Sequence, residues 1–590
     1  MPESSSNALR VLEARYLRRD AQGRVVETPS RLFRRVADAV AAAETAWGGG
    51  EARDRWAETF RLMMERLEFL PNSPTLMNAG TPLGQLSACF VLPVEDTMEG
   101  IFEAVKRMAV VQKTGGGTGF SFSRLRPRGS FLGSTGGEAS GPVSFMKIFD
   151  AATENIKQGG RRRGANMGIL RADHPDILEF IDAKRDGKTL QNFNISVGAT
   201  DAFLRAARAG KTYDLIHPAT RAKAGRLKAR EVFDRIAEAA WETGDPGLIF
   251  LDTINRANPT PRLGTIEATN PCGEIPLLPY EACNLGSINL SRMVTRKGRG
   301  FVIDWKRLGE TVRKGIRFLD DVVEANRYPF PEIDRMCRGN RKIGLGVMGF
   351  AELLLLLGVP YDAPKAASLG ERVMRFIAGE AREASRRLAK ERGPFPNWKG
   401  SVHERRRIRL RNAALTAVAP TGTISIIAGT SSGIEPLFAL AYRRRALEGK
   451  TLVDANPVFL AHLKENGLSR KDILRKVLEK GHLKDVEGIP EHTRRLFATA
   501  LDIPPDRHLA IQAAFQKHVD NSVSKTINLP AGATPDDVAD AYWRAWDLGL
   551  KGITIYRYGS KPTQVLELGT GEDPMQQEFA IKCDPSECRL

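Results

Sequence analysis

The chain has 590 residues, of which 42% are hydrophobic and 27% are charged, and its net charge is +18. This composition suits a large soluble protein with a sizeable core, and no apolar run approaches the ~20 residues of a membrane-spanning helix. Short basic clusters are spread along the chain without a recognised DNA- or RNA-binding motif, which excludes polynucleotide binding as the main function. The N-terminus lacks the basic and apolar regions of a signal peptide, and six cysteines are too few for a disulfide scaffold. We therefore expect a cytoplasmic protein.

Residues 1–50 are polar and predict a mainly helical lead-in. From residue 51 to 560, short apolar runs alternate with helical segments. Examples are the helix predicted over 231–241 and the strand predicted over 247–251. This alternation predicts an α/β architecture.

Two later segments differ in composition from the rest. Residues 446–515 are rich in Lys, Glu and His, and they predict helices at the periphery of the molecule. Residues 561–590 are rich in Gly, Pro and acidic side chains and predict a flexible tail.

Two short cysteine-containing segments carry most of the chemical information. The first is N-P-C-G-E at 270–274, and the second is A-C-N-L-G-S at 282–287. A cysteine can carry a radical or a thiolate, a glutamate can move a proton, and an asparagine can hold a hydroxyl group. If residues 270–274 are extended, alternate side chains point the same way, so Asn270, Cys272 and Glu274 are expected to converge on one ligand.

Together with motifs elsewhere in the chain, these segments resemble the large subunit of the ribonucleotide reductases. The other matching motifs are P-N-S-P-T-L-M-N-A-G (71–80), L-S-A-C-F (86–90), G-G-G-T-G (115–119), K-Q-G-G-R-R-R-G-A-N-M-G (157–168), A-P-T-G-T-I-S (419–425), S-S-G-I-E-P-L-F-A-L (431–440) and K-G-I-T-I-Y-R-Y-G-S (551–560). They follow one another in the order of that family.

The resemblance implies a ten-stranded α/β barrel with a finger loop threaded through its centre. It divides the chain into the lead-in, a catalytic barrel over 51–560 that includes an effector-specificity region at about 96–170, and a redox tail over 561–590. No segment resembling an ATP-cone domain is found in the lead-in, so control of overall activity by ATP and dATP is not expected.

The resemblance also gives the motif residues roles in ribonucleotide reduction. Cys272 becomes a thiyl radical that abstracts the 3′-hydrogen of the ribose. Glu274 is the general base for the 3′-hydroxyl group, and Asn270 hydrogen-bonds the sugar hydroxyls. Cys89 and Cys283 supply two electrons and close a disulfide.

The tail carries two further cysteines, Cys583 and Cys588, in C-D-P-S-E-C. A mobile arm can bring a thiolate to a buried disulfide and reopen it, with electrons from a thioredoxin- or glutaredoxin-like reductant. The alternative is half of a zinc site, but the tail holds no further cysteine or histidine that could complete it. Cys337 lies in no family motif and is interpreted as a small buried apolar residue.

The same resemblance implies sites for ribonucleoside diphosphates and for dNTP or ATP effectors. The expected substrate-binding residues are Ser73, Ala88, Cys89, Gly116, Gly117, Asn270, Cys272, Glu274, Pro420, Thr421, Gly422, Thr423 and Ile424. The expected effector-binding residues are Asp96, Thr97, Lys113, Arg126, Lys157, Gln158, Arg162 and Ala165. Without the resemblance, the glycine-rich segment 115–119 could equally be an ordinary tight turn. The basic segment 158–165 could equally be a solvated loop. In the family the effector lies at a dimer interface, which implies a homodimer.

The source of the radical distinguishes the classes of this family. A glycyl-radical class carries R-V-x-G-Y near its C-terminus, and a class served by a metal-radical subunit has two adjacent tyrosines where this chain has Tyr556 and Tyr558. The residues of the motifs at 135–146, 157–170 and 270–274 most resemble those of the adenosylcobalamin-dependent class, so adenosylcobalamin is the expected cofactor. Two alternatives stay open: a catalytic subunit that needs a radical-generating partner, and a non-catalytic nucleotide-binding regulator.

Overall fold

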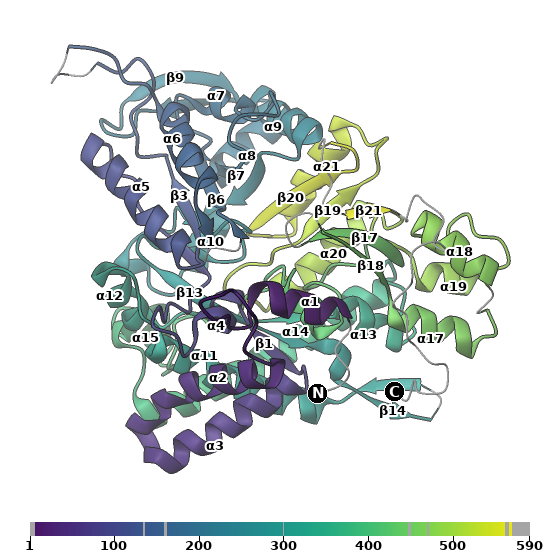
Figure 1. Ribbon diagram of the computed structural model, residues 1–590. Helices are drawn as coiled ribbons and strands as arrows, with labels where there is room; N and C mark the ends of the chain where they lie inside the picture. The colour runs from purple at the N-terminus through teal and green to yellow at the C-terminus, as the bar shows by residue number, and fades with distance from the viewer. Residues whose placement is uncertain are drawn as a thin grey trace.

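The computed structural model of the chain describes residues 6–131, 133, 136–158, 162–298, 300–446, 450–468, 471–560 and 566–568. Its central element is a large mixed sheet, around which helices are arranged (Figure 1). None of the helices in this described part is long and apolar enough to cross a membrane.

Five parallel strands form the first half of the sheet. They are β2 (Cys89–Val91), β3 (Gly117–Ser121), β6 (Asn166–Arg171), β7 (Phe193–Ala199) and β10 (Gly247–Phe250). The helices between them are α5 (Met98–Lys113), α6 (Pro142–Glu154), α7 (Ile177–Asp182), α8 (Asp201–Arg208) and α9 (Ala229–Thr243). All four residues of β10 are buried, as is typical of a strand that is covered on both faces.

The second half repeats this arrangement. Its strands are β13 (Ala282–Asn289), β16 (Ile343–Met348), the segment 416–418, β19 (Thr526–Leu529) and β20 (Gly552–Arg557). Its main helices are α11 (Trp305–Ala325), α12 (Pro331–Asn340), α13 (Phe350–Leu356), α14 (Pro364–Arg392), α20 (Pro505–Gln516) and α21 (Pro535–Asp547).

The two halves close into a barrel. They meet in antiparallel pairs at both edges, β10 with β20 and β13 with β2. Parallel bridges between Leu345 and Thr416 and between Val418 and Val523 join β16 to the strand that ends as β19. The expected ten-stranded α/β barrel is therefore confirmed.

A short hairpin, β11 (Ala268–Thr269) and β12 (Pro276–Leu277), lies inside the barrel. On one side it presses against β3, where a Cβ on Gly119 would lie 1.7 Å from the Thr269 carbonyl oxygen. On the other side the backbone N–H of Ser522, from the second half, donates to the carbonyl oxygen of Glu274 at 2.9 Å. The hairpin is the expected finger loop, and glycine at position 119 makes room for it.

Helices precede the barrel, as the lead-in predicts. They are α1 (Ser6–Arg15), α2 (Pro29–Ala41), η1 (Ala42–Glu44) and α3 (Thr45–Glu65), followed by β1 (Phe69–Pro71) and α4 (Ser73–Asn78). A buried ion-pair network anchors them to the barrel helices: Glu44 accepts from Arg317 of α11 at 2.5 Å and from Arg392 of α14 at 2.6 Å.

The prediction that residues 446–515 are peripheral is wrong for α20. This helix packs on α14, and its Leu509, Ile511 and Phe515 are buried. Its polar Gln512 is also buried and donates to the carbonyl oxygens of Val523 and Gly552. Polar side chains that hydrogen-bond barrel carbonyls gave this helix the composition of a surface segment.

The remaining elements are short or peripheral. They are β4 (Lys157–Gln158), β5 (Arg162–Arg163), β8 (Thr212–Ile216), β9 (Lys223–Lys228), α10 (Leu251–Arg256), η2 (Pro261–Leu263), η3 (Leu290–Arg292), β14 (Val294–Lys297), β15 (Gly300–Ile303), η4 (Pro396–Trp398), α15 (Val402–Arg405), α16 (Ile424–Ala428), β17 (Ala441–Ala446), β18 (Lys450–Ala455), α17 (Pro457–Glu465), α18 (Lys471–Lys480), α19 (Glu491–Leu496) and β21 (Leu566–Leu568). Helices α17 to α19 form a separate lobe to the right of the barrel in Figure 1.

Candidate active site

Residues 270–274 form the tip of the finger hairpin and are not extended, so the condition under which all three side chains would point the same way is not met. The N–H of Gly273 donates to the carbonyl oxygen of Asn270 at 3.1 Å, which closes a β-turn, and Gly273 has a φ of +79°. Asparagine at the first position, proline at the second and glycine at the fourth all favour such a turn. These turn preferences decide the local structure.

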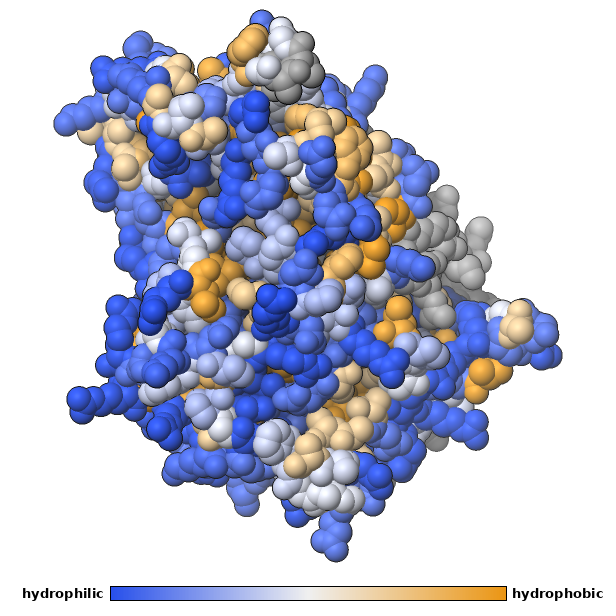
Figure 2. All heavy atoms as spheres, turned by 90° about the vertical axis from the view of Figure 1, so that its left-hand side faces the viewer, coloured by the Kyte–Doolittle hydropathy of each residue, from blue (hydrophilic) through white to orange (hydrophobic). Residues whose placement is uncertain are grey.

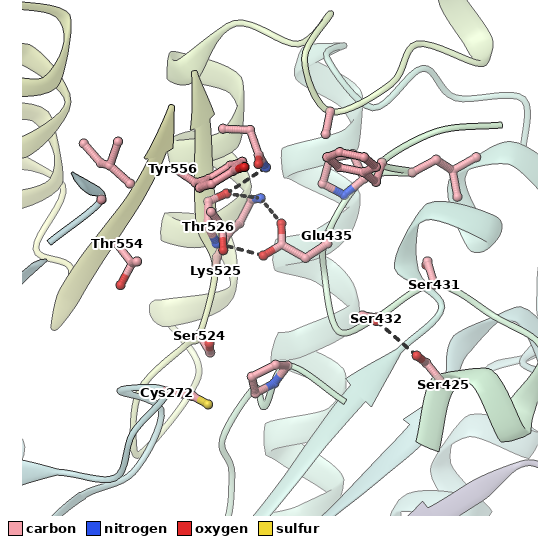
Figure 3. A pocket seen from close by; sticks show the side chains of 18 of the residues that line it. Cys272, Ser425, Ser431, Ser432, Glu435, Ser524, Lys525, Thr526, Thr554 and Tyr556 are labelled. Atoms are coloured by element: carbon pink, nitrogen blue, oxygen red, sulfur yellow. Dashed lines mark hydrogen bonds and ion pairs between the residues drawn. The ribbon is translucent and has the colours of Figure 1, made fainter. Parts of the chain in front are cut away.

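The turn still brings two of the three side chains together. The Asn270 Nδ2 donates to Glu274 Oε2 at 2.9 Å, and its Oδ1 accepts from the N–H of Ile275 at 3.0 Å. Asn270 and Glu274 are each only 2% exposed. Cys272, at the outermost position of the turn, is exposed and borders a cavity (Figure 3).

Cys89 and Cys283 lie directly opposite one another on the antiparallel strands β2 and β13. Opposite residues of such a pair have Cα atoms about 4.5–5.5 Å apart, which is within the range that a disulfide spans. Both cysteines are buried thiols. A reversible disulfide can therefore form here with little movement of the backbone.

Burial raises the pKa of each acidic group in this part of the site. Burial raises the pKa of Glu274 to about 7, although the hydrogen bond from Asn270 opposes the shift. Burial also raises the pKa of Cys89 well above its usual range, and the nearby Glu274, Cys283 and Cys272 add to this effect. The pKa of Cys283 is raised mainly by burial as well. A carboxyl group that titrates near 7 beside two neutral thiols is suited to proton transfer and dithiol oxidation.

A cavity of 710 Å³ adjoins Cys272. One wall comes from the barrel strands, with Thr526 of β19 and Tyr556 of β20, and the other comes from the chain that follows α16 and from the start of α17. Its size is typical of a site for a large ligand. Cys272 thus has the buried reactive groups on one side and a large cavity on the other.

Comparison with known proteins agrees with this architecture. The model of the ribonucleotide reductase all-alpha domain matches residues 3–84, and that of the ribonucleotide reductase barrel domain matches residues 87–556. The chain belongs to the ribonucleotide reductase family.

Two of its relatives, from an archaeon and a bacterium, carry the same name. It is 50% identical to the vitamin B12-dependent ribonucleoside-diphosphate reductase of Thermoplasma acidophilum, over 98% of this chain and 82% of that protein. It is 51% identical to the protein of the same name from Mycobacterium tuberculosis H37Rv, over 99% of this chain and 82% of that protein. Among solved structures, the alpha subunit of the Actinobacillus ureae class Id ribonucleotide reductase superposes with a TM-score of 0.77 at 25% identity, covering 94% of this chain and 97% of that one.

The expected phosphate-binding residues of this ribonucleotide reductase chain come from separate elements. Pro420 to Thr423 precede α16, and Ser73 opens α4. Gly117 N donates to the carbonyl oxygen of Ala88 at 2.8 Å, and a Cβ on Gly117 would lie 3.1 Å from the Pro271 ring. Glycine at 117 therefore makes room for the finger turn.

Of the expected effector residues, Asp96, Thr97 and Arg126 lie together. The Arg126 Nε pairs with Asp96 Oδ2 at 2.8 Å, and Thr97 caps the N-terminus of α5. Lys113 ends the same helix, about 24 Å from Thr97 at 1.5 Å per residue. Within a single copy of the chain, Lys113 therefore lies far from Asp96, Thr97 and Arg126. Ala165 lies just before β6, where its carbonyl oxygen accepts from the N–H of Thr118 at 3.3 Å.

Some predicted residues are described only in part or not at all. The strands β4 and β5 pair Gln158 with Arg162 and Lys157 with Arg163, which places these residues on a hairpin. Their side chains, and the tail cysteines Cys583 and Cys588, lie outside the described part. Their roles stay predictions.

A buried cluster at the cavity was missed in the sequence. Lys525 Nζ donates to Glu435 Oε2 at 2.6 Å, to the carbonyl oxygen of Thr526 at 3.1 Å and to His508 Nδ1 at 3.0 Å. His508 Nε2 donates to the carbonyl oxygen of Ala500 at 3.1 Å, which leaves Nδ1 to accept. Burial lowers the pKa of both Lys525 and His508. A lysine between two apolar β-branched residues, in V-S-K-T-I, was the available signal.

Proposed function

We propose that the chain is an adenosylcobalamin-dependent reductase that converts ribonucleoside diphosphates to 2′-deoxyribonucleoside diphosphates by a thiyl-radical mechanism. The observation that carries the proposal is the opposed pair of buried thiols, Cys89 and Cys283, beside the turn that holds Asn270, Cys272 and Glu274. The names of the relatives that are about half identical support the cofactor and the diphosphate substrate.

The reaction begins at Cys272. As a thiyl radical, its sulfur takes the hydrogen atom from C3′ of the ribose, which leaves a carbon radical at C3′. The Glu274 carboxylate accepts the proton of the 3′-hydroxyl group, and Asn270 orients both the carboxylate and the sugar. A pKa of about 7 suits Glu274 to take up and return this proton near neutral pH.

Cys89 and Cys283 complete the reduction. The 2′-hydroxyl group leaves as water after it takes a proton, and the two thiols give up two electrons and form the S–S bond between opposite strands. Cys272 then returns the hydrogen atom to C3′ and becomes a thiyl radical again. In sum, one ribonucleotide and two thiols give one deoxyribonucleotide, water and a disulfide. We propose that Cys583 and Cys588 reopen this disulfide by thiol exchange and are themselves reduced by a thioredoxin- or glutaredoxin-like protein.

The residues around the cavity fit adenosylcobalamin. The cofactor carries many carboxamide groups, and Asn456, Asn528 and Thr430 present side chains that can hydrogen-bond them. The Ser431 Oγ is buried in the same wall without a hydrogen-bond partner in the described part of the chain. Glu435 comes from the same segment as Ser431, and its carboxylate points toward Lys525, which donates to it (Figure 3). When bound, adenosylcobalamin supplies the oxidant that removes the hydrogen atom from the Cys272 thiol.

Replacing Lys525 with methionine is expected to weaken the binding of adenosylcobalamin. The substitution leaves the Glu435 carboxylate without its cation at the cavity wall, so we expect the Kd to rise about ten- to a hundredfold. Equilibrium dialysis in the dark measures this directly, without turnover. Lys517→Met is the matched control, since Lys517 pairs with Glu371 at the surface. Equal cofactor affinity in the two variants would contradict the role of Lys525.

A turnover assay tests the proposed function. The purified chain should form dCDP from CDP with dithiothreitol and an effector dNTP when adenosylcobalamin is present, and none when it is absent. Activity that appears without cobalamin once a partner protein is added would favour the class with a separate radical-generating subunit. Nucleotide binding without turnover in either condition would favour a non-catalytic regulator.

We further propose that dNTP or ATP effectors act at an interface between two copies of this chain. The face that carries α5 is mainly hydrophilic with small apolar patches (Figure 2). On α5 itself, Met98 is 56% exposed and Phe102 49% exposed, close to the Asp96 and Thr97 group. Met98 and Phe102 are four residues apart on one helix and so lie side by side, and a joined apolar patch rimmed by polar groups is typical of a surface that a partner covers.

A further inference from the structure

The end of helix α1 joins two residues of the expected phosphate site. The Arg15 Nη1 donates to Thr423 Oγ1 at 3.1 Å, and the Tyr16 hydroxyl hydrogen-bonds Ser73 Oγ at 2.7 Å. Arg15 and Tyr16 are consecutive, so their Cα atoms are about 3.8 Å apart. Ser73 and Thr423, which are distant in the sequence, are therefore both hydrogen-bonded to one dipeptide.

Arg15 lies at the edge of the loop formed by residues 420–423, which precedes α16. The Thr421 hydroxyl accepts from the N–H of Gly433 at 2.8 Å, which fixes the far side of the loop. A Cβ on Gly422 would meet nothing within 4 Å, so this part of the loop faces open space. Helix α1 packs against α16, the helix that the loop begins. Tyr16 is only 3% exposed, whereas Arg15 is half-buried.

We propose that Arg15 binds the diphosphate group of the substrate, and that Tyr16 positions Ser73 for the same ligand. The inference rests on the proposed function and deepens it. A guanidinium group has five N–H donors in a planar fork that matches two phosphate oxygens, so Arg15 can keep its bond to Thr423 and still contact the ligand. The helical lead-in then contributes directly to the site in the barrel.

The first test is a kinetic comparison of variants of the full chain with adenosylcobalamin. Arg15→Ala is expected to raise the KM for CDP about ten- to a hundredfold, because a charge-assisted hydrogen bond to phosphate is lost, and to leave kcat within about twofold. Arg15→Lys should recover part of the affinity, and Tyr16→Phe should raise the KM less than Arg15→Ala. Arg10→Ala, on the exposed side of the same helix, is the matched control and should behave as the unaltered chain does.

The second test separates phosphate binding from a purely structural role. Calorimetric titration of the chain without cofactor compares CDP with cytidine, which lacks phosphate. Arg15→Ala should reduce the affinity for CDP and leave that for cytidine, the affinity for an effector dNTP and the thermal unfolding midpoint unchanged. An unchanged KM and Kd for CDP, or an equal loss of affinity for cytidine, would overturn the proposal. If the unaltered chain binds CDP but does not reduce it, the proposed function fails while the titration still decides the role of Arg15.

Discussion

Replacement of Cys272 by serine is expected to abolish ribonucleotide reduction while leaving nucleotide binding intact. The serine O–H bond is too strong to exchange its hydrogen with a ribose C–H bond, so the radical cannot be passed to the substrate. We expect turnover to fall by about a thousandfold or more, because the group that starts the chemistry is removed. Cys272 is exposed at the tip of a turn whose backbone is fixed by Asn270 and Gly273, so the substitution should not disturb the fold.

A matched substitution at another cysteine separates radical chemistry from packing. Cys337 lies behind the strand of Cys283, where its sulfur accepts from the N–H of Ala282 at 3.1 Å, and it takes no part in the proposed mechanism. Cys337→Ser should retain dCDP formation. The measurement is dCDP formed per chain, alongside calorimetric titration with CDP and an effector dNTP. Turnover that survives in Cys272→Ser would show that the thiyl mechanism is wrong.

Substitution of Glu274 by glutamine should give the second largest effect. The amide keeps the hydrogen bond with Asn270 but cannot accept the 3′-hydroxyl proton, so we expect kcat to fall about 10²- to 10⁴-fold. The pKa of Glu274 is raised to about 7, mainly by burial. Because the base acts as the carboxylate, the rate in the unaltered chain should fall as the pH drops through about 7. The glutamine variant should lose this dependence.

Single-turnover formation of dCDP, measured across this pH range, tests both statements. Glu267→Gln is the control, since Glu267 lies just before the finger hairpin and pairs with Arg124 at the surface. That variant should keep the rate and the pH profile of the unaltered chain. A Glu274→Gln variant with a normal rate, or with the same decline near pH 7, would assign the base to another group.

The barrel could be predicted because its motifs are local and ordered along the chain. The strand predicted over 247–251 and the helix predicted over 231–241 correspond to β10 (Gly247–Phe250) and α9 (Ala229–Thr243). Alternation of apolar runs and helical segments indicates α/β architecture, but closure depends on pairings between distant strands, such as Val418 with Val523. In the sequence, only the family resemblance indicated that the strands close into a barrel.

The finger turn shows where local reasoning was incomplete. Convergence of three alternate side chains requires an extended segment, whereas asparagine, proline and glycine at 270, 271 and 273 favour a turn. Asn270 and Glu274 nevertheless lie together, because the turn brings the fifth residue back beside the first. The shape of the segment thus followed from turn chemistry and the pairing of β11 with β12.

The sequence by itself determined the family to which this protein belongs and the groups proposed to carry its chemistry. The identities of Cys89, Cys272, Cys283 and Glu274 carry that information, since their chemistry is a property of the side chains. The tertiary structure alone decided their environment. Burial depends on the whole fold, and it sets the pKa of Glu274 near 7. The pairing of β2 with β13 places the two thiols opposite one another. The packing of distant segments brings Lys525 to Glu435 and Arg15 to Thr423.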